Sequence, residues 1–276
     1  MDFRMNLDAY LARIGVSHPV KSDLDGLRAV HRAHALSLAF EDLDVQLAVP
    51  LTRDPARAYD KIVNRRRGGW CYEMNGLFGW ALEEIGFKVS RLAGAVMREA
   101  VGDAVIGNHL LLLVDIDGAP WIADVGFGGG LVDPVPLRVG AVDANPLGCR
   151  LDAIDGGWWR FTEDARMGGM SYDFNPAVDD EALLEKQCRF LQTDAASPFV
   201  QNAVAQRWIG EAHYSLRGRV LRILTPREEK KSIVATADAY VETLRETFGV
   251  DLPEAARLWP AICIRHEEVF GTEKAI

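Results

Sequence analysis

The chain has 276 residues, of which 49% are hydrophobic and 26% are charged, and its formal net charge at pH 7 is −9. This composition excludes disordered, collagen-like and low-complexity proteins, and a chain of this length buries enough surface to need no disulfide or metal to hold its fold. The negative charge argues against a nucleic-acid-binding protein, which usually presents a basic face.

Targeting and cysteine patterns favour a cytoplasmic protein. Residues 1–15 mix polar and apolar side chains and lack the apolar core of a signal peptide. The longest aliphatic run, residues 110–114, is far too short to span a membrane. The four cysteines are widely spaced and form no CxxC pair, which predicts a reducing compartment and no structural zinc site.

Helical periodicity dominates residues 1–86. Apolar side chains recur at helical spacing over 7–14, with Gly15 behind them as a stop, and a second helix is predicted over 24–38. The clearest helix covers 71–85, where the apolar side chains form one stripe and Gly86 occupies the C-cap position.

The period then changes to that of strands. Strands are predicted over 88–97, 109–116, 121–125, 150–154 and 158–162, with turns at 117–118 and 155–157. The last third mixes a helix over 181–190, strand over 214–225 around a turn at Gly218, and a helix over 237–248 with Gly249 behind it. We therefore predict an α+β protein: helices, then an antiparallel barrel or sheet, then a mixed tail.

Cys71 follows two glycines, Gly68 and Gly69, and begins the predicted helix over 71–85. A helix N-terminus carries unpaired N–H groups and about half a positive charge, which stabilise a thiolate. Cys71 also lies on the apolar stripe, so its side chain is expected to point inward. It is either a catalytic nucleophile or an ordinary small buried side chain.

His109 differs from the other five histidines because it begins a strongly apolar strand. A two-residue turn at Asp117 and Gly118 would place Asp124 on the same face of the hairpin as His109. A four-residue turn keeps both on one face, whereas a three-residue turn separates them. The favoured registers therefore bring a carboxylate beside the imidazole.

Cys71, His109 and Asp124 together suit a nucleophile, its base and the acid that orients the base. The alternative is a buried His–Asp pair that only braces the hairpin. The glycine-dense residues 126–130 after Asp124 match neither a dinucleotide fingerprint nor a Walker A loop, and they either let N–H groups approach an anion or form a plain turn. The arginines at 65–67 are either a solvated surface or partners for an acid that braces the Cys71 turn.

Five collinear motifs resemble the arylamine N-acetyltransferase family. They are RRGGWC at 66–71, NHLLL at 108–112, DVGFG at 124–128, FEDL at 40–43 and SPFVQN at 197–202. Two positions depart from the family pattern: Asp42 stands where asparagine is more frequent, and Ala39 where proline is common. Neither belongs to the triad, so the reaction class is unaffected, and we expect Glu41 to pair with an arginine near Cys71.

The resemblance implies a transglutaminase-like, papain-related fold in three parts: a helical bundle over 1–86 carrying the nucleophile, a β-barrel over 87–190 carrying the histidine and aspartate, and a mixed α/β lid over 191–276. It also implies a ping-pong acetyltransferase that uses acetyl-CoA as co-substrate and no metal. Cys71 would be acetylated by acetyl-CoA and would then pass the acetyl group to an arylamine, arylhydrazine or arylhydroxylamine.

The resemblance further assigns acetyl-donor binding to the glycine loop, through Gly126, Gly128 and Gly129, and a wall of the acceptor pocket to Phe127. Because Trp70 and Tyr72 flank the nucleophile, we expect both to line the acceptor pocket with Phe127.

Two alternatives stay open from the residues themselves. A cysteine hydrolase or a transglutaminase-like acyltransferase would use the same triad with a different acceptor. A non-catalytic binding module of this fold would be expected to lack a triad member, and all three are present. The expected partners are acetyl-CoA and a small aromatic amine or hydrazine, with no nucleic acid or membrane, and a homodimer is left open.

Overall fold

Helices fill the first third of the chain. The computed structural model describes residues 4–271, so residues 1–3 of the N-terminal stretch considered above, and residues 272–276, lie outside it. The helices predicted over 7–14, 24–38 and 71–85 are confirmed. The elements in this part are α1 (Leu7–Ile14), α2 (Leu24–Ser37), the short strand β1 (Phe40–Glu41), α3 (Leu43–Gln46), α4 (Pro55–Tyr59), the π-helical turn η1 (Asp60–Asn64) and α5 (Cys71–Ile85).

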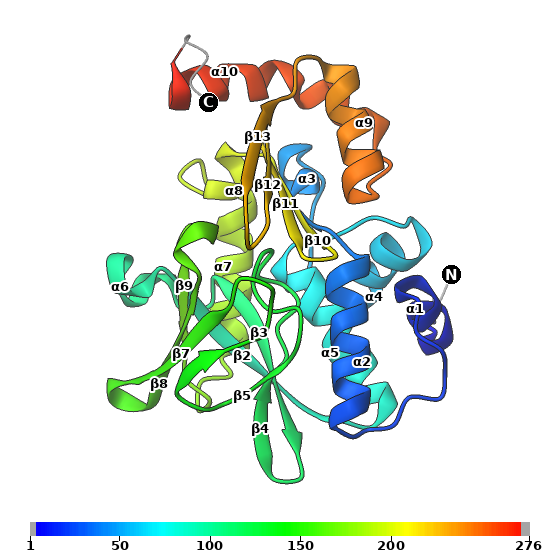
Figure 1. The fold of residues 1–276 in the computed structure, drawn as a ribbon, viewed down its shortest axis with the longest axis vertical. Coiled ribbons are helices and arrows are strands. Elements are labelled where there is room, and N and C mark those ends of the chain that lie inside the picture. Colours follow the sequence, from blue (N-terminus) through cyan, green and yellow to red (C-terminus); the bar gives the residue numbers. More distant parts are fainter. Residues whose placement is uncertain (1–3, 272–276) are drawn as a thin grey trace.

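The middle of the chain forms an eight-stranded sheet, antiparallel throughout, that curls into a nearly closed barrel (Figure 1). Its strands lie in the order β5-β4-β3-β2-β9-β8-β7-β6, and its core contains Leu92, Leu111, Phe161 and Tyr172. The strands are β2 (Lys88–Val96), β3 (His109–Ile116), β4 (Ala119–Ile122), β5 (Val135–Pro136), β6 (Gly140–Val142), β7 (Cys149–Ile154), β8 (Trp158–Glu163) and β9 (Ser171–Phe174).

The hairpin of β3 and β4 has the predicted two-residue turn. Ile116 pairs with Ala119, and both turn residues have positive φ, 54° at Asp117 and 82° at Gly118, which is typical of a type I′ turn. The strand predicted over 121–125 is wrong at both ends, since β4 covers Ala119–Ile122. Asp124 lies beyond the sheet because its carboxylate and the following backbone bind side chains of another element, described below.

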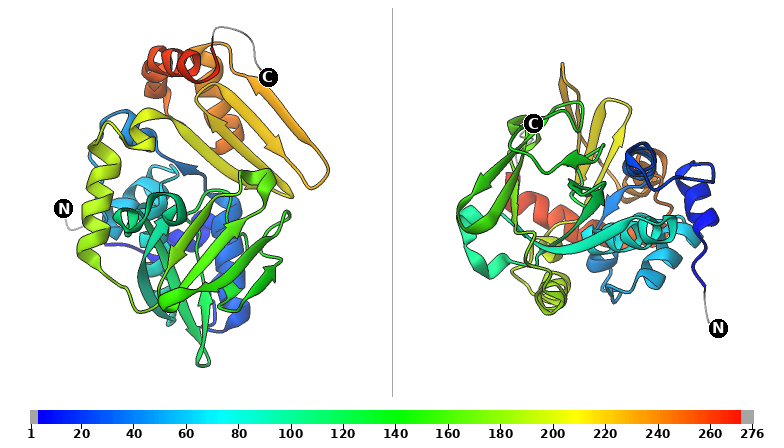
Figure 2. Two further views of the ribbon diagram at one scale, coloured as in Figure 1. Left: turned by 90° about the vertical axis from the view of Figure 1, so that its left-hand side faces the viewer. Right: turned by 90° about the horizontal axis from the view of Figure 1, so that it is seen from below.

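The last third contains a second antiparallel sheet with the order β1-β10-β11-β12-β13. Figure 2 shows it beside the barrel, with α9 and α10 packed at its far end. The predicted strand region 214–225 is a hairpin of β11 and β12, and the helix predicted over 237–248 is α9, whereas β10, β13 and α10 were not predicted. The elements are α7 (Glu181–Thr193), α8 (Pro198–Gln201), β10 (Val204–Ile209), β11 (Ala212–Arg217), β12 (Val220–Leu224), β13 (Glu229–Ile233), α9 (Ala237–Phe248) and α10 (Trp259–Phe270).

Two connections cross the predicted domain boundaries. Helix α7 continues past residue 190, and β1, from the helical first third, pairs with β10 through Phe40 opposite Gln206 and Glu41 opposite Ala205. Because these contacts join the three predicted parts, their division into 1–86, 87–190 and 191–276 stays a prediction. Of the helices between residues 4 and 271, none combines the length and apolar character that crossing a bilayer needs.

Helix α5 and strand β3 share one core, and this positions the site. Phe78 and Leu82 of α5 pack in the same apolar cluster as Leu112 and Val114 of β3. Burying one large apolar side chain in this way stabilises the fold by roughly 1.5–3 kcal/mol. The packing holds the beginning of the barrel hairpin against the helix that carries Cys71.

Candidate active site

Cys71 is the first residue of α5, and its side chain is 3% exposed. The backbone before it turns in a space that only glycine fits, because a Cβ on Gly68 would lie 2.1 Å from the carbonyl oxygen of Ala39. On the other side, the Trp70 N–H donates to the Glu73 carboxylate at 3.3 Å. The helix N-terminus is thereby held with the Cys71 side chain turned into the protein.

A buried cluster of five charged side chains supports this turn. Lys61 Nζ lies 2.8 Å from Glu73 Oε2 and 3.0 Å from Asp44 Oδ2. Arg67 NH2 lies 2.8 Å from Glu41 Oε1 and 3.0 Å from Asp44 Oδ1. The expected pairing of Glu41 with an arginine near Cys71 is confirmed, and Arg67 is the arginine concerned. Removing one member of such a cluster is costly, because the others stay buried without their partner.

The protonation of this cluster follows from burial and charge. Burial alone would lower the pKa of Lys61, but the three surrounding carboxylates raise it, so the ammonium form is retained. Burial also raises the pKa of Glu73, with Lys61 opposing that shift. For Asp44, the effect of Lys61 and Arg67 exceeds that of burial and lowers its pKa. Sequence patterns did not reveal Lys61, Asp44 or Glu73 as members.

His109 and Asp124 form a buried pair, with His109 Nε2 2.7 Å from Asp124 Oδ2. Since Nε2 faces the carboxylate, Nδ1 is left for the Cys71 side chain, which lies near enough to raise the pKa of the imidazole. The structure thus brings the three predicted residues together, although Asp124 reaches His109 from the segment beyond β4 and not from a paired strand. This order of thiol, imidazole and carboxylate suits activation of a nucleophile.

The electrostatics of the pair favour a protonated histidine. Burial alone would lower the pKa of His109, but the Asp124 carboxylate and the Cys71 sulfur raise it to about 10. Burial would raise the pKa of Asp124, yet the nearby His109 and the hydrogen bonds from Asn75 and Gly126 lower it. At neutral pH His109 is therefore an imidazolium beside an ionised Asp124.

Asn75 is a site residue that the sequence reasoning missed. Its Nδ2 donates to Asp124 Oδ1 at 2.8 Å and to the Leu110 carbonyl at 2.6 Å, while its Oδ1 accepts from Val125 N–H at 3.0 Å. It lies four residues after Cys71 and so on the same face of α5. That spacing is the one signal in the sequence that could have identified it.

The glycine loop after Asp124 passes close over the nucleophile. A Cβ on Gly126 would lie 2.8 Å from Cys71 Cα and 2.5 Å from Asn75 Nδ2, so the loop requires glycine there. Gly128 packs against the Gln206 side chain of β10, and Gly129 packs against Met167. The loop therefore joins the catalytic residues to the second sheet, and its predicted part in donor binding stays a prediction.

The three aromatic residues predicted for the acceptor pocket lie in two places. The Phe127 ring is 5.4 Å from the His109 ring and 4.9 Å from Tyr172, beside a cavity of about 10 Å³ that Asp124 also lines. Trp70 and Tyr72 are fully buried, outside the lining of that cavity, and the Tyr72 hydroxyl donates to the Gly107 carbonyl at 2.6 Å. Phe127 is thus adjacent to the triad, whereas the other two rings form core beneath it.

Comparison with known proteins identifies the family of this chain and agrees with its fold. Residues 23–257 match the family model described as N-acetyltransferase. The chain is 34% identical over 275 residues to the arylamine N-acetyltransferase of Mycolicibacterium smegmatis, and the alignment covers 91% of this chain and 94% of that relative. The chain belongs to the arylamine N-acetyltransferase family. The resemblance inferred from the motifs is confirmed.

Solved structures of arylamine N-acetyltransferases share the fold along nearly their whole length. The M. smegmatis enzyme superposes with a TM-score of 0.85 at 32% identity, covering 94% of this chain and 98% of that one. The Mycobacterium marinum enzyme, solved in complex with CoA, superposes with a TM-score of 0.84 at 33% identity, covering 93% and 98%. The predicted α+β fold is confirmed.

Asp42 departs from the arylamine N-acetyltransferase pattern directly after β1, where this strand pairs with β10. Its Oδ1 accepts from Val204 N–H at 2.8 Å, while its Oδ2 is buried and has no partner among the residues that the structure describes. Burial raises its pKa well above the usual range for aspartate. The raised pKa favours the neutral acid form of Asp42, which resembles the asparagine more frequent in the family.

Within residues 4–271, no group of three or more His, Cys, Asp or Glu side chains is arranged to hold a metal ion. The four cysteines are unpaired thiols, and Cys71, Cys149 and Cys188 are buried. Cys71 lies near the His109 imidazole, whereas burial raises the pKa of Cys149 to about 12 and also raises that of Cys188.

Proposed function

We propose that the protein transfers an acetyl group from acetyl-CoA to arylamines, arylhydrazines and arylhydroxylamines through an acetyl-Cys71 intermediate. The observation that supports this most directly is the position of Cys71, which lies at a helix N-terminus against the buried His109–Asp124 pair. Membership of the arylamine N-acetyltransferase family supports the acceptor class, and a related enzyme solved with CoA supports the donor.

In the first half-reaction, the Cys71 thiolate attacks the thioester carbonyl of acetyl-CoA. A bond forms between the Cys71 sulfur and the acetyl carbon, and the bond from that carbon to the CoA sulfur breaks. The proton on His109 then goes to the CoA thiolate, so CoA leaves as a thiol and the imidazole becomes neutral. This half-reaction uses the imidazolium that the raised pKa of His109 provides at neutral pH.

In the second half-reaction, the amine nitrogen attacks the acetyl carbon of the thioester. Neutral His109 takes the proton that the amine loses, and the Cys71 thiolate leaves as the amide forms. The thiolate–imidazolium pair is then restored. Asp124 supports the imidazolium in both steps and fixes the ring so that Nδ1 faces the sulfur.

Asn75 acts as a positioning residue in this scheme. It binds Asp124 on the oxygen that His109 does not use, and it belongs to the same helix as Cys71. A displacement of α5 would thus move the nucleophile and the support of the acid together. Geometry held in this way contributes to rate by keeping the reacting atoms aligned.

We further propose that Gly126, Gly128 and Gly129 border the acetyl donor, since this loop lies directly over Cys71. Phe127 forms one wall of the acceptor site, because its ring is the aromatic side chain of the loop beside His109. Trp70 and Tyr72 support this region from the core, a reading that their burial favours over direct contact with the amine.

The experiment is intact-mass spectrometry of the protein mixed with acetyl-CoA in the absence of an acceptor. We expect a gain of one acetyl group on Cys71, discharged when an arylamine is added. The Cys71→Ala variant should stay folded by circular dichroism and take up no acetyl group. An active and folded Cys71→Ala variant would overturn the mechanism.

A cysteine hydrolase using the same triad is the second candidate, and the same experiment separates the two. A hydrolase would release CoA steadily with no acceptor present, whereas a transferase would stop after one acetyl group per chain. Cytoplasmic location and a homodimer stay predictions, which cell fractionation and light scattering of the purified protein can test.

A further inference from the structure

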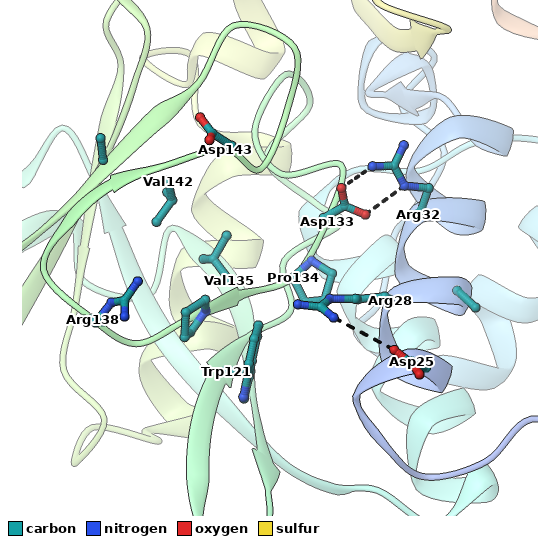
Figure 3. A pocket seen from close by; sticks show the side chains of 13 residues that line it. Asp25, Arg28, Arg32, Trp121, Asp133, Pro134, Val135, Arg138, Val142 and Asp143 are labelled. Carbon is teal, nitrogen blue, oxygen red and sulfur yellow. Dashed lines mark hydrogen bonds and ion pairs between the residues drawn. The ribbon is translucent and has the colours of Figure 1, made fainter.

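A second concave site lies away from the triad, in the crevice between helix α2 and the barrel (Figure 3). The crevice measures about 860 Å³, which is within the range of small-molecule sites. Cys71, His109 and Asp124 are not among the residues that line it. Nothing in the acetyl-transfer scheme accounts for this crevice.

Three arginines face the crevice from both sides. Figure 3 shows Arg28 and Arg32 on helix α2 and Arg138 on the barrel side opposite them. Three carboxylates, those of Asp25, Asp133 and Asp143, also line the crevice, so which guanidinium groups are open to a ligand depends on how these carboxylates are placed. Guanidinium groups bind carboxylates with two parallel hydrogen bonds and are the usual residues for that purpose.

The carboxylates of the crevice leave two of these arginines available. Arg32 is engaged by Asp133, whose Oδ1 accepts from Arg32 Nε at 2.8 Å and whose Oδ2 accepts from a second guanidinium nitrogen. Arg28 lies 3.9 Å from Asp25, a loose contact with a side chain that is 96% exposed. An exposed ion pair of this kind contributes little to stability, so Asp25 does not hold Arg28 away from a ligand.

Arg138 is the clearest open position. Among the residues that the structure describes, its guanidinium has neither a hydrogen-bond nor an ion-pair partner, and Asp143, the remaining carboxylate of the crevice, forms no ion pair with any of the three arginines. A bound carboxylate would therefore replace water at Arg138 without displacing an existing protein partner.

The floor of the crevice suits an aromatic ring. Trp121 is half-buried there, with Arg28 lying 5.6 Å from its ring centroid. Pro134, Val135 and Pro136 continue the apolar surface beside it. Flat apolar surface next to guanidinium groups is the combination that binds a ring bearing an acid, since rings stack on indole and on guanidinium planes.

We propose that this crevice binds a small aromatic carboxylate, with its ring on Trp121 and the neighbouring prolines and its carboxylate on Arg138 and Arg28. The site is independent of acetyl transfer, because it shares no residue with the triad or its glycine loop. Its ligands therefore need no amine, which separates them from the acceptors of the catalytic reaction.

The test is isothermal titration calorimetry with naphthalene-2-carboxylate, an aromatic acid that has no amine to be acetylated. We expect saturable binding of one molecule per chain, weakened about tenfold or more in an Arg28→Ala/Arg138→Ala double variant. Arg150→Ala, which removes an exposed arginine on β7, is the matched control and should bind as the unmodified protein does. The double variant should keep its acetyl-transfer rate, which shows that it is folded.

Two further measurements decide the outcome. The uncharged naphthalene-2-carboxamide should bind at least tenfold more weakly, because it offers no charge to the guanidinium groups. Phe127→Ala should leave the affinity for the acid unchanged. No saturable binding, equal binding of acid and amide, or loss of binding in Phe127→Ala with retention in the arginine variant would each overturn the proposal.

Discussion

Replacing Asn75 with alanine removes three hydrogen bonds at the centre of the site. The side chain binds Asp124, the Leu110 carbonyl and the Val125 N–H, all of them buried. The change leaves Cys71, His109 and Asp124 in the protein, so any loss of activity reports on how the acid is held.

The expected loss of activity follows from the hydrogen bond between Asn75 and Asp124. A hydrogen bond to a charged group contributes roughly 1.5–3 kcal/mol, and about 1.4 kcal/mol corresponds to a factor of ten in rate. We therefore expect kcat/KM for acetyl transfer to fall roughly tenfold to a hundredfold in Asn75→Ala. The pKa of Asp124 should rise, because one of the groups that lower it is lost. Leaving the Val125 and Leu110 groups without partners costs roughly 1–3 kcal/mol of stability each.

The assay is the single-turnover rate of Cys71 acetylation as a function of pH, together with urea unfolding. Asn64→Ala is the matched control, because Asn64 is exposed and, within residues 4–271, its side chain bonds only to Asp60, at 3.0 Å. We expect the control to match the unmodified protein in both measurements. If Asn75→Ala kept the unmodified rate and pH profile, the positioning role would be refuted, even if stability fell.

Three further changes test other parts of the structure. Phe127→Ala should alter the preference among ring-substituted arylamines by roughly tenfold in kcat/KM, and an unchanged preference would contradict its place in the acceptor wall. Lys61→Met should lower the free energy of unfolding by roughly 3–5 kcal/mol, because three carboxylates lose a buried partner, whereas the exposed Lys186→Met should have little effect. Asp42→Asn should gain stability over the unmodified protein as pH rises. Because the pKa of Asp42 is raised on folding, the stability that this carboxyl contributes is fully present below its unfolded pKa and is lost as pH rises through its folded pKa. A difference in urea midpoint between the two proteins that did not change with pH would contradict the raised pKa.

Local patterns in the sequence were enough for the catalytic elements. The helix over 71–85 is evident because its apolar side chains recur at helical spacing and Gly86 ends it. The turn at Asp117 and Gly118 is evident from its two turn residues, and it sets the pairing of β3 with β4. Both signals act over a few residues, where the backbone geometry itself imposes the period.

Sequence alternation was less reliable at the end of β4. It placed Asp124 in a strand, whereas the sheet ends at Ile122 and Asp124 reaches His109 from the irregular segment beyond it. The final position depends on Asn75, which binds Asp124 and the Val125 N–H from helix α5. A contact between a helix and a loop has no period that could be read along the chain.

Only the tertiary structure decided the remaining features. The pairing of Phe40 with Gln206, the burial of Lys61 among three carboxylates and the crevice between α2 and Arg138 each join segments that are distant in sequence. A charged residue in a sequence is by default expected at the surface, and its burial depends on partners that folding brings to it. The sequence by itself determined the helix that begins at Cys71 and the hairpin that begins at His109, because those arise from local period and turn chemistry. Their support, their surroundings and the second crevice arise from packing between elements.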